Sequence, residues 1–250
     1  MEYFLELLLG GLTRGSIYAL IALGYTMVYG IIELINFAHG EIYMIGAFTG
    51  LIAASVLNLY GMEGPAVLIL AAVAAVVWAA CYGFTVEKIA YKPLRQAPRL
   101  SPLISAIGMS IFLQNYVLLA QTSDFLPFPR LIPDFAFLEP VSQFFGSSEL
   151  VILATTTSVM AALTLLIKFT RIGKAMRATA QDRSMAMLVG INVNRVISLT
   201  FVVGSSLAAL GGVLIASHIG QINFAIGFIA GIKAFTAAVL GGIGSIPGAV

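Results

Sequence analysis

The sequence predicts an all-α, polytopic helical bundle that lies in a membrane and contains an inverted repeat with interrupted helices. Three observations support this prediction: a composition with few charges, a series of long apolar stretches, and a motif that occurs twice within them. Of the 250 residues, 60% are hydrophobic and 10% are charged, and the mean hydropathy is +1.00. A soluble domain has about 25% charged residues, so this chain has too few charges to cover a water-facing surface.

Apolar stretches long enough to form spanning helices recur along the sequence. A helix needs about 20 apolar residues to cross the hydrocarbon layer. The candidate spans are residues 12–32, 39–59, 65–86, 101–121, 150–168, 196–217 and 224–242. We therefore expect one transmembrane domain over residues 1–250 with about seven spans. Because the sequence ends in the apolar stretch GGIGSIPGAV, we also expect further spans beyond it.

The lysine and arginine residues predict how the spans are oriented. Ten of the thirteen fall in two stretches: Lys88, Lys92, Arg95 and Arg99 in the first, and Lys168, Arg171, Lys174, Arg177, Arg183 and Arg195 in the second. Cytoplasmic loops are enriched in these residues, so both stretches should be cytoplasmic. The loop at 122–149 contains four acidic residues and only Arg130, and it should lie outside. Counting the spans backwards then places the N-terminus outside as well.

A fourteen-residue motif occurs in two copies. INFAHGEIYMIGAF at 35–48 aligns without gaps to INFAIGFIAGIKAF at 222–235, and nine of the fourteen positions are identical. This indicates a duplication with copies near residues 12–59 and 196–242. The first copy begins with a span that runs inward and the second with a span that runs outward, so the copies are inverted. Inverted repeats are typical of transporters, with the substrate route at the repeat interface and interrupted helices lining it.

Polar residues gather in the first copy of this motif, within a stretch that is otherwise apolar. We hypothesise that both copies are helix breaks that meet near the middle of the membrane, beside the substrate route. A glycine in each copy would permit the turn, and an asparagine would supply a side-chain partner for the released backbone groups. The helix N-termini that follow would favour an anionic group such as a carboxylate. The residues assigned to the breaks or the route are Asn36, Phe37, His39, Gly40, Glu41, Asn223, Gly227 and Lys233.

His39 and Glu41 occur only in the first copy, and the pair could have a catalytic, a structural or a gating role. A catalytic acid and base would need further polar groups in other helices, yet the chain has one other histidine, His218, and no acidic residue after Asp182. An enzyme with catalytic residues is therefore not expected. A structural role within the break and a gating role in transport are compatible, because unwound backbone in a membrane is tolerated where it is buried in protein or lines a cavity.

Lys233 stands in the second copy at the position of Gly46 in the first. A basic side chain at the bilayer centre costs about 2.5–3.5 kcal/mol on insertion scales. The side chain could extend toward the membrane surface, or it could pair with Glu41 or Glu33. The sequence favours neither alternative.

The segment at 171–191, RIGKAMRATAQDRSMAMLVGI, is predicted to couple the chain to an ATPase. The chain itself has no G-x-x-x-x-G-K-[ST] motif, so any ATP-driven transport requires a partner ATPase. An ordinary basic loop would explain the charges equally well, but it would not need a helical middle rich in Met and Ala. We expect one cytoplasmic helix over residues 176–190, roughly parallel to the membrane, and Gly190 is suited to end it. The coupling residues are Arg177, Ala180, Asp182, Arg183, Met185 and Gly190, and Met176, Met187 and Leu188 could also face a groove.

Three blocks resemble one known family: ALIALGYTMVYGIIELINFAHGEIYMIGAF, GKAMRATAQDRSMAMLVGINVNRV and GIKAFTAAVLGGIGSIPGA. They are similar to the permease subunit of branched-chain amino acid ABC importers, the LivH type. The resemblance covers nearly the whole chain, although the acidic start of the general coupling motif is degenerate. It implies a multi-pass permease of the bacterial inner membrane that carries leucine, isoleucine and valine.

The resemblance also implies partners. These are a second homologous permease, two cytoplasmic ATPases and a periplasmic amino-acid-binding protein, with no cofactor, no metal and no nucleic acid. N-terminal residues would then be periplasmic. The alternative function is a passive channel or secondary carrier for a small polar solute, such as another amino acid or urea. That function would explain the repeat but not the coupling segment.

Overall fold

The computed structural model describes residues 2–95, 97–98, 100–133, 146–242 and 244. Its elements are α1 (Glu2–Ile32), α2 (His39–Leu59), α3 (Pro65–Val86), the π-helix η1 (Glu87–Tyr91), the 3-10 helix η2 (Lys92–Leu94), α4 (Leu100–Ala120), β1 (Leu126–Pro127), α5 (Ser147–Phe169), α6 (Arg171–Gln181), α7 (Arg183–Leu188), α8 (Val193–Ile219), β2 (Gln221–Ile222) and α9 (Ile226–Leu240). The all-α prediction is confirmed.

Each of the seven predicted ranges contains a helix, because long apolar runs without interior proline satisfy their backbone groups within the helix. Among the described residues, six of these helices are long and apolar enough to cross a membrane. The seventh, α9, has 15 residues and is shorter than a full span. Arg99, part of the 122–149 loop and the chain end beyond residue 244, where continuation was expected, lie outside the described residues.

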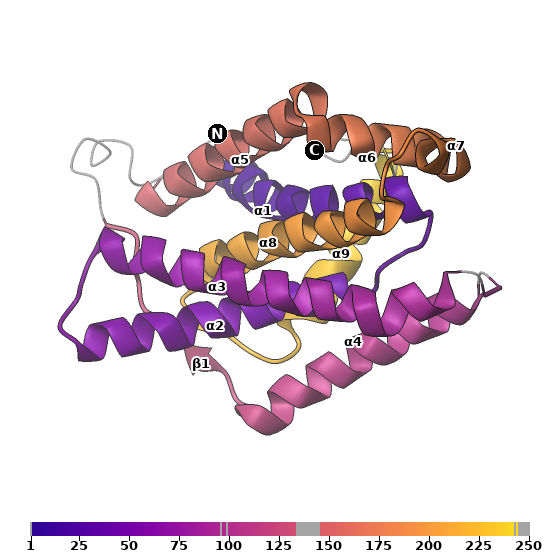
Figure 1. The fold of residues 1–250 in the computed structure, drawn as a ribbon. Helices are drawn as coiled ribbons and strands as arrows, with labels where there is room; N and C mark the ends of the chain where they lie inside the picture. The colour runs from indigo at the N-terminus through magenta and orange to yellow at the C-terminus, as the bar shows by residue number, and fades with distance from the viewer. Residues whose placement is uncertain (1, 96, 99, 134–145, 243, 245–250) are drawn as a thin grey trace.

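The helices are arranged around α1 and α8, the two most buried helices of the bundle. In Figure 1, α8 crosses the centre, while α5 and α4 lie at opposite outer sides. Small residues allow the central helices to approach closely. A Cβ at Gly50 of α2 would meet the Val213 side chain of α8 at 2.7 Å, and one at Gly46 would clash with Ala209. Such small-residue contacts are typical of helix pairs in membranes.

The two repeat copies break at equivalent positions. Position 35 of the first copy corresponds to 222 of the second, an offset of 187 residues (222 − 35). With that offset, Ile32 at the end of α1 corresponds to Ile219 at the end of α8, and His39 at the start of α2 corresponds to Ile226 at the start of α9. In Figure 1, α1 and α8 run in opposite directions. These features support an inverted duplication.

Both basic stretches lie at one end of the bundle. Helices α6 and α7 and the connection between η2 and α4 are found together at the right of Figure 1. We call this the basic end, defined by residues 87–95 and 171–195. The spans predicted at 101–121 and 150–168 separate the two basic stretches, so both stretches should lie on the same side of the membrane. Their shared location agrees with that prediction.

The coupling segment is not one continuous helix from 176 to 190, as the sequence suggested. Asp182 has an extended backbone and ends α6, and its carboxylate accepts hydrogen bonds from the backbone N–H groups of Ser184 (2.8 Å) and Met185 (3.0 Å). An aspartate in this role caps the start of a new helix. Gly190 does end α7, in the left-handed conformation at φ 84°, as expected for a glycine that follows a helix.

A two-stranded antiparallel sheet joins the loop after α4 to the segment after α8. Leu126 pairs with Ile222 and Pro127 with Gln221, and the Phe128 N–H donates to the Gly220 carbonyl at 2.9 Å. No pattern in the sequence predicted this sheet. It attaches the loop to the second helix break.

Candidate translocation site

Both copies of the motif leave the helix and turn in the same way. The chain exits α1 through Glu33 at φ 54° and exits α8 through the equivalent Gly220 at φ 77°. The left-handed conformation costs roughly 1–2 kcal/mol for a residue with a Cβ and little for glycine. Each exit then leads to a turn, in which His39 N–H donates to the Asn36 carbonyl (3.0 Å) and Ile226 N–H to the Asn223 carbonyl (3.3 Å). This is the geometry that the helix-break hypothesis required.

The two breaks lie against each other at Gly40 and Gly227. A Cβ at Gly40 would lie 2.5 Å from the Gly227 carbonyl oxygen and 2.9 Å from the Gly231 Cα. In the opposite direction, a Cβ at Gly227 would lie 2.6 Å from the Gly40 carbonyl oxygen. We call residues 33–41 and 220–227 the break pair. The contact between its halves is backbone to backbone, so any side chain at these glycines would separate them.

The asparagines do not cap the following helices, contrary to the sequence-based expectation. The N-cap residues are alanines in both copies, Ala38 and Ala225, and neither has a side-chain cap hydrogen bond. The Asn36 side chain is instead used for a tertiary contact: its Oδ1 accepts a hydrogen bond from the Tyr91 hydroxyl at 2.9 Å. The turn before α2 is closed by the backbone carbonyl of Asn36, so the Asn36 side chain is available to bind Tyr91 of η1.

His39 and Glu41 are both buried beside the break pair. The His39 ring packs edge-on against Tyr25, with ring centroids 4.8 Å apart, and a Cβ at Gly24 would clash with it. Glu41 Oε1 accepts a hydrogen bond from the Ser110 hydroxyl of α4 at 3.0 Å. Glu41 Oε2 and His39 Nε2 are buried without a hydrogen-bond partner among the described residues. Two buried polar atoms without a partner at one helix crossing are unusual in a packed interior and call for a specific explanation.

A cavity of about 440 Å³ adjoins the break pair between α4 and α9. Its lining is mostly apolar and aromatic, with Ser110 and Gln114 as polar groups. The lining residues are Tyr25, Phe37, Ile107, Ser110, Ile111, Gln114, Gly227, Phe228, Gly231, Ile232 and Phe235. A small-molecule site typically combines an apolar wall with a few polar groups. Within the described residues, there is no group of three or more His, Cys, Asp or Glu that could hold a metal ion.

Lys233 does not form the ion pair that was one of its two predicted alternatives. Among the described residues, no carboxylate lies within 4 Å of its ammonium, whether that of Glu41, Glu33 or another residue. Glu41 is held by Ser110 instead, and Glu33 is exposed. The Lys233 ammonium lies 5.6 Å from the centre of the Tyr18 ring on α1, within the range of a cation–π interaction.

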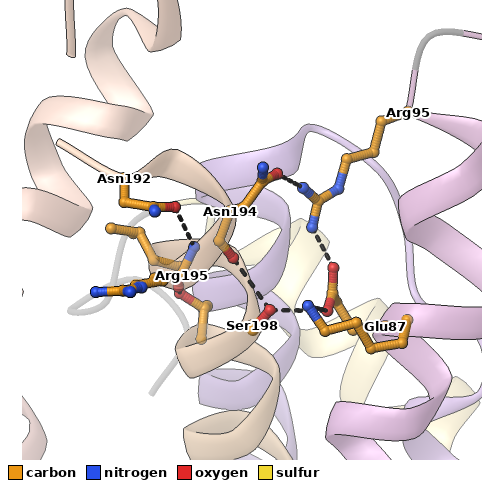
Figure 2. Close-up of polar contacts among 9 residues, drawn as sticks. Glu87, Arg95, Asn192, Asn194, Arg195 and Ser198 are labelled. Atoms are coloured by element: carbon orange, nitrogen blue, oxygen red, sulfur yellow. Dashed lines mark hydrogen bonds and ion pairs between the residues drawn. The ribbon is translucent and has the colours of Figure 1, made fainter. Parts of the chain in front are cut away.

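A second buried acid, Glu87, connects η1 to the start of α8 at the basic end (Figure 2). Its side chain is fully buried, and it forms ion pairs with Arg95 and, at 3.6 Å, with Lys88. Glu87 Oε2 also accepts a hydrogen bond from the Ser198 hydroxyl at 2.8 Å, while Arg95 donates to Asn194 Oδ1 at 2.5 Å. Both carboxylate oxygens therefore have partners, as a buried charge requires.

The π-helix explains how this cluster reaches the first break. In η1 the backbone turn widens, and such turns often occur at functional sites. Glu87, at one end of η1, binds α8, while Tyr91 at the other end donates to Asn36 and packs against Phe201 with ring centroids 5.1 Å apart. Glu87 and Tyr91 were not among the site residues predicted from the sequence. An acidic residue at the end of an apolar span was a usable signal for Glu87, but no local pattern marked Tyr91.

The coupling segment presents a mostly apolar surface at the basic end. Met185, Met187, Leu188 and Val189 are each exposed over more than half of their surface, and Ala180 and Arg177 are exposed as well. Met176 is buried at 3% exposure, so it cannot face a partner as the sequence suggested.

Arg183 connects this segment to α1 rather than to a partner. Its Nε and Nη2 donate to the Ile31 carbonyl at 3.1 and 2.7 Å. The last carbonyl groups of a helix have no partner within it, and a cation is favoured there. The coupling segment therefore touches α1 directly before the first break.

Comparison with known proteins defines the class of this chain. Residues 7–250 match the family described as "Branched-chain amino acid transport system / permease component". The high-affinity branched-chain amino acid transport system permease protein BraD of Pseudomonas aeruginosa is 52% identical over 252 residues, which are 99% of this chain and 82% of BraD. The LivH proteins of Escherichia coli K12 and Salmonella typhimurium LT2 are each 51% identical, over 252 and 253 residues, again with 99% of this chain and 82% of theirs covered.

No solved structure gives a significant match. The chain belongs to the family of branched-chain amino acid transport permeases. It is a multi-pass membrane protein with a transport role, and its relatives are permease components rather than enzymes.

Proposed function

We propose that this chain is the membrane-spanning subunit of an ATP-driven importer that carries leucine, isoleucine and valine across a bacterial inner membrane. The observation that carries the proposal is the break pair, where two interrupted helices meet at Gly40 and Gly227 beside a cavity. Interrupted helices at the interface of inverted repeats are where transporters place their substrate route. The apolar wall of the cavity suits a branched aliphatic side chain. The relatives, which are permeases for branched-chain amino acids by name, support the same substrates.

The remaining subunits of the proposed importer are a second homologous permease, two cytoplasmic ABC ATPases and a periplasmic amino-acid-binding protein. In this assembly the basic end faces the cytoplasm and the N-terminus is periplasmic, in agreement with the positive-inside rule. The exposed apolar surface of α7 is the proposed ATPase contact. An exposed apolar patch rimmed by basic residues is typical of a protein interaction site.

The contact between Arg183 and Ile31 supplies a mechanism for coupling. When the ATPase moves α7, Arg183 transmits the displacement to the end of α1, because it holds the Ile31 carbonyl through two hydrogen bonds. Residue 33 begins the first break. A shift there would alter how Gly40 sits against Gly227, and it would open or close the adjacent route. This is the proposed role of the coupling segment.

Copurification tests the proposed subunit composition. The permease, tagged and coexpressed with the other proposed subunits, should copurify in mild detergent with a second permease and two ATPase chains. The purified complex should hydrolyse ATP faster when the leucine-loaded binding protein is added. A permease that purifies alone, carries leucine and does not depend on an ATPase would contradict the proposal and support a secondary carrier or channel.

The coupling contact predicts a loss of transport from charge substitutions on its surface. Met185→Asp and Ala180→Asp should each abolish ATP-driven leucine uptake, because a carboxylate on the apolar contact surface must be desolvated without a partner. Since both positions are exposed, the permease should still fold and insert at normal levels. The matched control is Met62→Asp in the connection between α2 and α3, where the methionine is also exposed; it should transport normally. Normal uptake by both α6–α7 variants would refute the assignment.

A further inference from the structure

The Lys233 ammonium lies beside the middle of the candidate span formed by α1. It lies 5.6 Å from the ring of Tyr18, and Tyr18 is 12 residues from the start and 14 from the end of the candidate span Glu6–Ile32. At a rise of about 1.5 Å per residue, both ends of that span are roughly 18–21 Å away. A four-carbon stem cannot cover this distance, so the ammonium does not reach either end of that span. This distance argues against the second predicted alternative, in which the Lys233 side chain extends to the membrane surface.

Within the part of the chain that the structure describes, no acidic side chain shields this charge. Lys233 is exposed on α9, and no carboxylate of a described residue lies within 4 Å of it. Its one recorded partner is the Tyr18 ring. An exposed ammonium at this depth is strongly disfavoured in contact with lipid, and charged residues inside a membrane usually face a water-filled passage or a bundle interior. The face that carries Lys233 is therefore not a lipid surface.

A second cation occurs on the same face. Arg14 lies four residues before Tyr18 on α1, and residues at i and i+4 of a helix are neighbours on its surface. Arg14 is exposed and forms no ion pair with the described residues. Gly11 and Gly15 flank it, and a Cβ at either would meet nothing within 4 Å. We define the cationic face as Gly11, Arg14, Gly15 and Tyr18 of α1 with Lys233 of α9.

We propose that the cationic face lines a part of the passage outside the cavity between α4 and α9, and that Lys233 binds the carboxylate of the amino acid in transit. None of the five residues of this face lines that cavity. This inference rests on the proposed function, since it assigns a group of the substrate to a residue. An amino acid carries its carboxylate and ammonium through the membrane with an uncharged side chain, so the passage must offer a cation at depth. Lys233 is that cation, and Arg14 forms an earlier contact nearer the N-terminal end of α1. The Lys233 ammonium has three N–H donors on a flexible stem. It can therefore bind and release a carboxylate without the fixed geometry of a bidentate contact.

Cysteine labelling in the complete transporter tests this assignment without requiring transport. The parent carries Cys81→Ala, because Cys81 is exposed. Ile229→Cys places a thiol one turn before Lys233 on the same side of α9, where Ile229 is exposed. Val77→Cys is the control, at an exposed position in the middle part of α3. Membrane vesicles are treated with the impermeant anionic reagent sulfonatoethyl methanethiosulfonate and with its trimethylammonium counterpart.

The expected result is modification of Ile229→Cys and none of Val77→Cys, with the anionic reagent faster than the cationic one by about tenfold, as a cationic passage concentrates anions. Adding Lys233→Met should abolish this preference, and Lys233→Arg should retain it. No modification of Ile229→Cys, no charge preference, or a preference that survives Lys233→Met would each overturn the inference. Leucine uptake by the Cys81→Ala parent is measured separately, so a parent that imports leucine but fails the labelling refutes the passage assignment and leaves the proposed function intact.

Discussion

Gly40→Ala is expected to reduce leucine uptake to background and to lower the free energy of unfolding by about 1–3 kcal/mol, the usual cost of overpacking. The added methyl group would lie 2.5 Å from the carbonyl oxygen of Gly227 and 2.9 Å from the Cα of Gly231. These are backbone atoms of α9, so the steric clash can be relieved only if the whole helix moves. Uptake in vesicles and the thermal unfolding midpoint of the purified complex measure the two effects.

Gly108→Ala provides the matched control for this substitution. Gly108 lies in α4, and a Cβ there would meet nothing within 4 Å. Since alanine is the better helix former by about 1 kcal/mol, the control should preserve uptake and keep or raise the unfolding midpoint. If Gly40→Ala behaved like Gly108→Ala, the break pair would not be in tight contact, and the proposed route beside it would lose its main structural support.

Arg95→Met is expected to destabilise the permease by about 3–5 kcal/mol, because removing one partner of a buried ion pair leaves the other charge uncompensated. Glu87 is fully buried, and Arg95 is its closest cation. Lys88→Met is the control: that lysine is 3.6 Å from Glu87 and its side chain is 34% exposed, so its loss should cost about 1 kcal/mol or less, as for surface ion pairs.

A double substitution separates this charge effect from lost packing. Glu87→Gln with Arg95→Met removes both charges and keeps both side-chain volumes similar, so it should recover most of the stability lost in Arg95→Met alone. With Glu87→Gln measured alone as well, the three variants complete a double-mutant cycle that gives the coupling energy of the pair. If the single and the double variant were equally destabilised, the loss of stability in Arg95→Met would not come from an uncompensated charge on Glu87. The proposed role of this ion pair in stabilising the permease would then be refuted.

The helices and the helix breaks could be predicted from local sequence. Long apolar stretches must form helices in a bilayer because their backbone groups have no other partner, and this explains the agreement over ranges such as 39–59 and 65–86. The repeated motif with glycine at positions 40 and 227 indicated the breaks, since only glycine permits the backbone contact found there. Where chemistry is local, sequence was sufficient.

Features that depend on distant contacts were not predictable in this way. The partner of the Asn36 side chain is Tyr91, 55 residues away, and nothing near either residue indicates the other. The pairing of Leu126 with Ile222 joins two segments of two residues each, too short to give an alternating pattern. The depth of Lys233 became apparent only from its contact with Tyr18.

One error was avoidable from the sequence. Asp182 was treated as part of a continuous coupling helix, although aspartate is among the residues most favoured at helix N-caps. The structure shows it in that role, with Ser184 and Met185 as donors. The resulting bend exposes Met185 on α7 and turns Arg183 toward Ile31. A capping rule applied to the segment would have predicted two short helices.

ATP-dependent accumulation of leucine is the most direct test of whether this chain is part of an ATP-driven importer. The complete transporter is reconstituted in proteoliposomes with ATP inside and the leucine-loaded binding protein outside, and radiolabelled leucine inside is followed over time. An ATP-driven importer should accumulate leucine above its external concentration, and accumulation should stop when ATP is replaced by a non-hydrolysable analogue or when the binding protein is omitted. Equilibration of leucine to the external concentration without ATP would contradict it, since a channel or carrier would then explain the transport.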